Sequence, residues 1–421
     1  MLIKNARWIL TPHKVLKQQD IYIEDGRIVE FKRQEADTVI DASEHLVMPG
    51  FINAHTHIPM TFLRGLAEDL PLKEWLEKEV WPREKKISGR LVYYASLLGM
   101  AEALASGTTT IVDMYFFQKE IARAAKESGI RAWLGYGLMD TAPGTDLAKE
   151  ARKEREAREA VRRTGCGRIK PIISPHSPYT CSKELLLHSK RISEEEGLPL
   201  QIHVSETKEE VAESKQLKGK TPLKYLDSLG LLGPRTLMAH GVWLSATETV
   251  IAARRKAVLV HCPVSNLKLG SGIAPIHKYL QKGITVGLGT DGPASNNSLN
   301  MFKEMRMAAL SQKLSNPQFT TRKVIEMATK NGATALDKDI GRIETGSKAD
   351  LIIVNLDQPH MMPIINSEQA INNLVYCAQG SEVSHTIVNG NVVARNGKAV
   401  HVDVEKTAQH LMKEMDIRGI L

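Results

Sequence analysis

Two hydrophobic patterns divide the chain. In the middle, short apolar runs with the length of buried strands alternate with amphipathic stretches of helical period, a pattern typical of parallel α/β folds. The strand candidates are residues 46–54, 108–113, 132–138, 169–174, 199–204, 235–240, 257–261 and 284–290. Eight such units that close on themselves predict a (β/α)₈ TIM-like barrel.

Local signals mark the ends of two of the predicted helices. One helix is expected from Ser88 to Ser106, where Gly107 ends it. Another is expected to begin at Ser245, because Glu248 three residues later completes a capping-box pattern.

The two ends of the chain read differently, as short strands joined by tight turns. Residues 2–10, 21–24 and 27–31 are strand candidates near the start, and residues 349–354, 383–388 and 391–393 are candidates near the end. Asp25-Gly26 and Asn389-Gly390 are typical of type I′ hairpin turns. We therefore expect residues 1–48 and 345–400 to form one β-sandwich module, residues 49–344 to form the barrel, and residues 401–421 to form a C-terminal helix.

Composition narrows the class of protein. Hydrophobic residues make up 42% of the 421 residues, which is enough for a sizeable core. The four cysteines are scattered and the start of the chain lacks a signal-peptide pattern, so we expect a reduced, cytoplasmic protein. No apolar run approaches the roughly 20 residues needed to cross a bilayer. The net charge is +8, but basic residues lie among acidic ones in runs such as residues 149–156. Such mixed-sign runs predict solvated helix faces, so we expect no nucleic-acid binding.

Histidine and aspartate residues recur where the predicted barrel strands end. In such barrels this carboxyl-terminal end carries the chemistry. The residues are His55, His57, Asp113, His176, His203, His240, His261 and Asp291. His261 fits packing as well as catalysis, and Asp113 is expected to brace the barrel mouth.

His55 and His57 end the first predicted barrel strand. Side chains two residues apart on a strand point the same way, so both imidazoles can reach one ion. Taken alone, the pair fits a metal site and simple packing equally well.

Several short motifs make the chain resemble the amidohydrolase superfamily. They are residues 47–57 (VMPGFINAHTH), 203–207 (HVSET), 239–241 (AHG), 261–263 (HCP), 289–292 (GTDG) and 346–351 (GSKADL). The resemblance covers essentially the whole chain, including the strand-rich ends.

The resemblance implies four metal ligands, His55, His57, His203 and Asp291. Three neutral imidazoles and one carboxylate suit Zn²⁺, and Fe²⁺ or Mn²⁺ accept similar ligands. Relatives with two metals use a lysine at the end of the fourth strand, where this chain has residues 174–178 (SPHSP). We therefore expect one zinc ion per subunit.

Glu206 follows His203 by three residues, where the strand ends and a helix begins. Hydrolysis at such a site needs a group that takes a proton from water and gives one to the substrate, and a carboxyl beside the metal can do both. The alternative is a glutamate that only stabilises the helix dipole; the position beside His203 favours catalysis. We expect His240, with Asp291, to contact the nucleophilic water and stabilise charge.

Three segments are similar to a family that deaminates S-adenosylhomocysteine, methylthioadenosine and 5′-deoxyadenosine. They are residues 81–84 (WPRE), 174–182 (SPHSPYTCS) and 289–297 (GTDGPASNN). The resemblance implies that Glu84 accepts hydrogen bonds from the ribose hydroxyls, that His176 contacts the nucleoside, and that Asp291 serves both metal and purine. The predicted function is hydrolytic deamination of adenine nucleosides, adenosine included, to inosine-type products and ammonia.

The sequence departs from the family pattern in one feature, and two alternative functions also fit it. Some family members hold a substrate carboxylate with arginine near the third strand, where this chain has residues 134–138 (LGYGL). Because this stretch contains no arginine, S-adenosylhomocysteine is the less favoured substrate; Arg152 or Lys149 are candidate substitutes for that arginine. The alternatives are another amidohydrolase, such as an s-triazine chlorohydrolase or guanine deaminase, and a noncatalytic barrel. The resemblance also implies a homo-oligomer.

Overall fold

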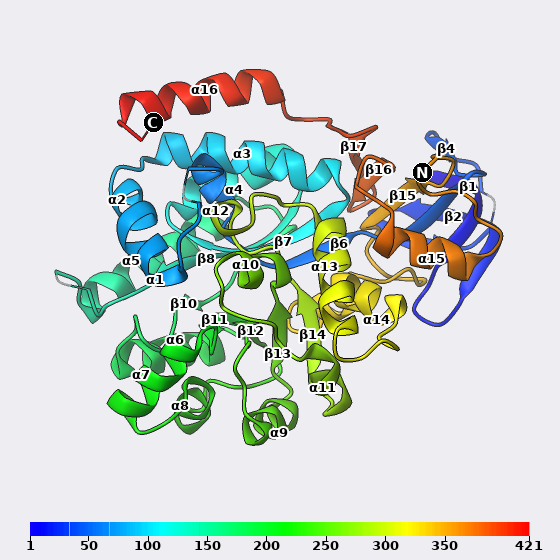
Figure 1. Cartoon of the computed structure of the whole chain (residues 1–421). Helices are drawn as coiled ribbons and strands as arrows, with labels where there is room; N and C mark the ends of the chain where they lie inside the picture. Colours follow the sequence, from blue (N-terminus) through cyan, green and yellow to red (C-terminus); the bar gives the residue numbers. More distant parts are fainter. Residues whose placement is uncertain (33, 67, 143, 421) are drawn as a thin grey trace.

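The computed structural model describes residues 1–32, 34–66, 68–142 and 144–420. Within these ranges, parallel strands form a barrel whose fourth strand is in two pieces (Figure 1). The barrel strands are β6 (Phe51–Thr56), β7 (Thr108–Tyr115), β8 (Arg131–Leu138), β9 (Ile169–Pro171) with β10 (Ser174–Pro175), β11 (Leu200–Val204), β12 (Thr236–His240), β13 (Val258–His261) and β14 (Thr285–Leu288). The predicted barrel is confirmed.

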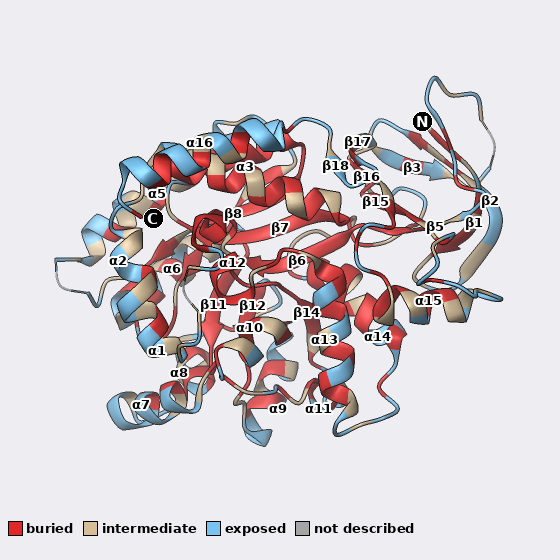
Figure 2. Cartoon of the chain, turned by 45° about the horizontal axis from the view of Figure 1, so that its top comes forward, coloured by how far each residue is buried: buried red, intermediate tan, exposed pale blue. Residues whose placement is uncertain are grey.

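Hydrogen bonds close the ring between the last and first strands. Asp291 N donates to His55 O at 3.1 Å, Asn53 Nδ2 donates to Thr290 Oγ1 at 2.7 Å, and Thr290 N donates to Asn53 Oδ1 at 3.0 Å. The barrel consists of two sheets, one of strands β6 to β10 and one of strands β11 to β14. These two sheets also meet at a parallel bridge between Ile173 and Leu200. The strand residues are almost all buried, because side chains fill the barrel on one side and helices cover the other (Figure 2).

The barrel helices follow their strands in sequence order. They are α3 (Gly89–Ala105), α4 (Gln118–Ser128), α5 (Leu147–Arg162), α6 (Lys183–Glu195), α7 (Lys208–Lys218), α8 (Pro222–Leu229), α9 (Ala246–Arg255), α10 (Pro263–Lys268), α11 (Ile276–Gln281), α12 (Pro293–Asn296), α13 (Met301–Lys313), α14 (Thr321–Glu326) and η3 (Met327–Asn331). Two predicted ends are confirmed. Ser88 caps α3 by accepting from Leu91 N, and Ser245 and Glu248 form the capping box of α9.

The apolar run 46–54 was expected to be one barrel strand, and that expectation is wrong. The run contains two strands, β5 (His45–Pro49) and β6, separated by Gly50. Gly50 N bonds to Asp350 O, and a β-carbon at Gly50 would lie 2.1 Å from the Thr109 side chain. The chain thus passes from one sheet to the other at a point where the Thr109 side chain leaves no room for a β-carbon, so that glycine is required.

The two ends of the chain build one sheet beside the barrel (Figure 1). Its order is β18-β17-β16-β15-β5-β1-β2-β3, with β4 beside β1. The bounds are β1 (Leu2–Leu10), β2 (Val15–Glu24), β3 (Arg27–Glu30), β4 (Val39–Asp41), β15 (Leu351–Asn355), β16 (Val383–Val388), β17 (Asn391–Arg395) and β18 (Lys398–Ala399). Because β5 pairs with both β1 and β15, the expected composite module is confirmed.

Both type I′ turns are confirmed by their backbone angles. Asp25 and Gly26 have φ values of 49° and 73°, and Asn389 and Gly390 have values of 51° and 76°. Positive φ at both central residues defines this turn, which glycine adopts without strain.

Further helices flank these two bodies. A covering segment between β6 and α3 contains η1 (Ile58–Leu63), α1 (Leu72–Glu74), η2 (Trp75–Val80) and α2 (Trp81–Glu84). Helix α15 (Ser367–Tyr376) lies between β15 and β16 in sequence, and α16 (Val404–Ile417) lies along α3 (Figure 1). None of the helices in the described part of the chain is long and apolar enough to span a membrane.

Candidate active site

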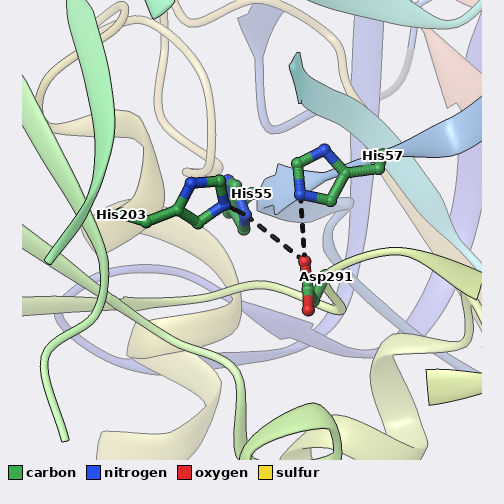
Figure 3. Close-up of side chains that lie close together, drawn as sticks. All are labelled: His55, His57, His203 and Asp291. Atoms are coloured by element: carbon green, nitrogen blue, oxygen red, sulfur yellow. Dashed lines mark hydrogen bonds and ion pairs between the residues drawn. The ribbon is translucent and has the colours of Figure 1, made fainter. Parts of the chain in front are cut away.

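Four side chains from three strand ends converge at the mouth of the barrel (Figure 3). His55 lies in β6 and His57 directly follows its last residue, His203 lies in β11, and Asp291 lies in the turn after β14. One ligand atom of each lies within 4.8 Å of those of the others. Asp291 Oδ1 is 3.2 Å from His57 Nε2 and 3.5 Å from His55 Nε2. This donor set fits a divalent transition-metal ion.

The other polar atoms of the four ligand residues make hydrogen bonds that orient the cluster. Each Nδ1 lies near an oxygen: Met114 O for His57 (2.5 Å), Gln201 Oε1 for His55 (3.3 Å) and His176 O for His203 (2.7 Å). Asp291 Oδ2 accepts from the hydroxyls of Ser265 (2.6 Å) and Ser295 (2.7 Å). An Nδ1–H that donates outward leaves Nε2 free for a metal, and fixed outer partners of this kind tune metal sites.

The charges around the cluster favour a cation. Burial opposes the charge on Asp291, yet hydrogen bonds from His55 and His57 hold its pKa well below the usual range. Burial also opposes a charge on His57, but the bond to Asp291 raises the pKa of His57 to about 9. Burial and neighbouring imidazoles lower the pKa of His203, so this ring is neutral. The ionised Asp291 therefore favours a positive charge at the cluster.

Strained backbone surrounds the cluster. Ser205, His240 and Asp291 have φ values of 53°, 70° and 58°, in the left-handed region that residues other than glycine rarely adopt. Each stands at or just after a barrel strand end. Such conformations persist where the surrounding structure enforces them, and they gather at functional sites.

Glu206 and His240 face each other beside the metal cluster. Glu206 Oε2 lies 3.7 Å from His240 Nε2, and Ser271 Oγ donates to Glu206 Oε1 at 3.1 Å. His240 Nδ1 donates to Asn266 Oδ1 at 2.9 Å, which directs Nε2 toward Glu206. Burial raises the pKa of Glu206, while Glu206 and Asp291 raise the pKa of His240 against the effect of burial. A carboxyl with a raised pKa is suited to taking and returning a proton near neutral pH.

A single cavity joins these groups to the other predicted substrate residues. Glu84 and His176 line it together with His57, His203, Glu206, His240 and Asp291. Apolar side chains of the covering segment, among them Leu72, Trp75, Leu76, Val80 and Trp81, form another wall. Burial raises the pKa of Glu84 to about 7, although nearby Tyr115 lowers it. The cavity thus combines an apolar wall, a metal-ligand cluster and the separate, partly buried carboxyl of Glu84.

Other candidates from the sequence lie elsewhere. Lys149 Nζ contacts Gly144 O on the surface, Arg152 is exposed, and neither lines the cavity. His261 is buried outside the cavity lining, and burial lowers its pKa to about 3. Asp113 Oδ1 accepts from Ile58 N at 2.6 Å, which anchors the start of η1.

Sequence reasoning missed several supporting residues. Ser265 and Ser295 bind Asp291, Gln201 approaches His55, and Ser271 binds Glu206. Ser295 lies inside a segment that carried the resemblance, but a serine in a one-turn helix such as α12 has no spacing that distinguishes a ligand-orienting role. Only the fold brings these side chains to the cluster.

The barrel, its composite β module and the His-His-His-Asp cluster define a metal-dependent hydrolase. The Amidohydrolase family model matches residues 46–393, so the chain belongs to the amidohydrolase family. The resemblance found in the sequence is confirmed.

Named relatives narrow the class further. The 5-methylthioadenosine/S-adenosylhomocysteine deaminase of Pyrococcus furiosus is 43% identical over 422 residues, covering 99% of this chain and 100% of the relative. The 5′-deoxyadenosine deaminase of Methanosphaera stadtmanae is 41% identical, covering 93% of each chain. A solved adenosine deaminase from Xanthomonas campestris with bound zinc has a TM-score of 0.93 and 31% identity, covering 100% of this chain and 98% of the other. The chain is a metal-dependent hydrolytic deaminase.

Proposed function

We propose that the enzyme deaminates adenine nucleosides at C6 of the purine, giving inosine-type products and ammonia. The substrates are 5′-deoxyadenosine, methylthioadenosine, S-adenosylhomocysteine and adenosine. The observation that carries the proposal is the shared cavity, in which the partly buried Glu84 and His176 stand with the His-His-His-Asp cluster and Glu206. The deaminase relatives, named for adenine nucleosides, support it.

The metal in this proposal is one Zn²⁺ held by His55, His57, His203 and Asp291, with Fe²⁺ or Mn²⁺ as substitutes. A bound divalent ion lowers the pKa of a water molecule it holds to about 7, which supplies a nucleophile at neutral pH. The zinc in the Xanthomonas campestris structure supports this choice. The expected homo-oligomer and cytoplasmic location stay predictions.

Side chains of the cavity transfer the protons in the proposed reaction. Glu206 accepts a proton from the attacking water and delivers it to the purine ring nitrogen next to C6. His240 and Asp291 hydrogen-bond the same water and stabilise the charge that develops as C6 becomes tetrahedral. Glu206 then assists the departure of ammonia. Ser271 keeps the Glu206 carboxyl in place through these steps.

Glu84 and His176 bind the nucleoside. An ionised carboxylate offers two acceptors, which match the two hydroxyls of a ribose diol. Glu84 is ionised once those donors reach it, because hydrogen bonds to the charged form offset burial. His176 Nδ1 lies 3.0 Å from Thr180 Oγ1, so its Nε2 remains available to the ligand.

A substrate panel tests the function. The panel holds 5′-deoxyadenosine, methylthioadenosine, S-adenosylhomocysteine, adenosine, adenine and guanine, and the readout is loss of adenine absorbance or release of ammonia. Turnover of the nucleosides, with free bases poor, supports the proposal. Turnover of guanine alone, or of no purine by metal-loaded enzyme, contradicts it.

We expect one metal ion per chain and activity that depends on it. Dialysis against a chelator should abolish turnover, and one equivalent of Zn²⁺ should restore it, because the donor atoms form a single cluster. Metal analysis and activity titration measure both quantities. An activity that saturates at two equivalents would contradict a mononuclear site.

We expect Glu84→Gln to weaken binding of ribose-bearing substrates. Hydrogen bonds to a charged group contribute about 1.5–3 kcal/mol, so KM should rise by roughly 10- to 100-fold while kcat changes little. The matched control is 2′,3′-dideoxyadenosine, which lacks the diol and should show almost no difference between variant and wild type. An equal rise in KM for both substrates would place Glu84 elsewhere.

A further inference from the structure

Glu210 in α7 binds the backbone of the segment that carries Glu206. Its Oε1 accepts from Ser205 N at 3.0 Å, and its Oε2 accepts from Glu206 N at 2.6 Å. The residue is 8% exposed, so both bonds are shielded from water. Both oxygens of one carboxylate are therefore engaged by two consecutive amides.

This arrangement differs from ordinary helix capping. Helix α7 begins after Thr207, whose hydroxyl accepts from Glu210 N. In a capping box, the glutamate at this position accepts from the N–H of the capping residue itself. Glu210 instead reaches past Thr207 to the two residues before it, which follow the end of β11 and lie at the candidate site.

The amides of Ser205 and Glu206 converge because of the strained turn. Ser205 has a φ of 53°, and successive N–H groups around a left-handed residue form a concave site for an anion. A serine adopts this conformation at a cost that its surroundings must offset. The Glu210 carboxylate fills the concave site and offsets that cost.

The strained turn lies between a metal ligand and the proton-transfer group. His203 precedes Ser205 by two residues, and Glu206 follows it directly. If the turn relaxed to an ordinary φ, the Glu206 side chain would leave Ser271 and His240. We infer that Glu210 is a positioning residue, which holds the Ser205 turn and so aims the Glu206 carboxyl at the site.

This inference rests on the role proposed for Glu206, and kinetics of Glu210→Gln test it. The glutamine matches the glutamate in size, but its NH₂ group must face one of the backbone N–H groups. We expect kcat to fall by about 10- to 100-fold, since a displacement near 1 Å can cost that much. KM and bound metal should stay close to wild type. Glu209→Gln is the matched control, because Glu209 is the exposed neighbour on the same helix, and it should leave kcat unchanged.

A double-mutant cycle separates positioning from general stability. If Glu210 acts through Glu206, adding Glu210→Gln to Glu206→Gln should lower kcat by no more than about twofold. A full additional loss in that background, or wild-type kcat in Glu210→Gln alone, overturns the inference. Should Glu210→Gln fail to fold, Glu210→Asp enters the same cycle, because the shorter side chain cannot reach both amides.

Crystal structures of wild type and Glu210→Gln give a readout that needs no substrate. The expected result is a Ser205 φ outside the left-handed region and a displaced Glu206 carboxyl. An unchanged turn with Glu206 in place overturns the inference. Failure of the nucleoside panel would overturn the proposed function and leave this structural result standing.

Discussion

Replacing Glu206 by glutamine is expected to lower kcat by about 10²- to 10⁴-fold, the range that general acid–base catalysis contributes. The amide keeps the shape of the side chain and can still accept from Ser271 Oγ, but it cannot take up a proton and return it. KM and metal content should change little, because Glu206 lies outside the metal-ligand cluster. Steady-state kinetics with the best nucleoside and metal analysis of the same preparation measure these effects.

A control variant and one contrary outcome test whether Glu206 carries the proton. Glu209→Gln removes the same charge from an exposed position three residues away and should retain wild-type kcat. If Glu206→Gln kept kcat within tenfold of wild type, the proton would have to pass through His240. His240→Asn would then show the larger loss.

The barrel could be read from the sequence because it depends on local patterns, whereas the four metal ligands were implied by motifs that resemble those of the family. Polar residues at strand ends, such as His203, are visible in a periodic sequence, and parallel strands bring their carboxyl ends together. The boundary at Gly50 could not be read this way. The apolar run continues through it, and only the approach of Thr109, from the next barrel strand, shows why a glycine separates the two strands.

The supporting contacts of the site were beyond sequence reasoning for a similar reason. Ser265 and Ser295 reach Asp291 from two different short helices, α10 and α12, and Glu210 looks like any glutamate near a helix start. The left-handed φ of Ser205 has no sequence signal, because serine is not a residue that favours it. The geometry shows what holds the predicted ligands and Glu206 in place.

Asp350 belongs to a segment that resembled the family, and the structure gives it a physical role. Its Oδ1 accepts from Arg131 Nη2 at 2.9 Å and its Oδ2 from Arg131 Nε at 2.5 Å, in a bidentate pair. The two side chains are 1% and 2% exposed. Arg131 begins barrel strand β8, while Asp350 directly precedes β15 of the terminal sheet. The pair therefore ties the two bodies together across 219 residues of sequence.

Asp350→Ala is expected to lower the free energy of unfolding by about 3–5 kcal/mol, because it leaves the Arg131 guanidinium buried without a counter-charge. The amide of Asn389, which donates to Asp350 Oδ1 at 2.7 Å, also loses its partner. Denaturant unfolding followed by circular dichroism measures the change.

Asp339→Ala is the matched control: its pair with Arg27 joins the same two bodies, but these side chains are 36% and 48% exposed. Such a pair contributes about 0–1 kcal/mol. Equal losses of unfolding free energy in both variants would show that burial does not set the strength of this connection. A selective loss in Asp350→Ala would explain why an acidic residue far from the metal stands in a segment typical of the family.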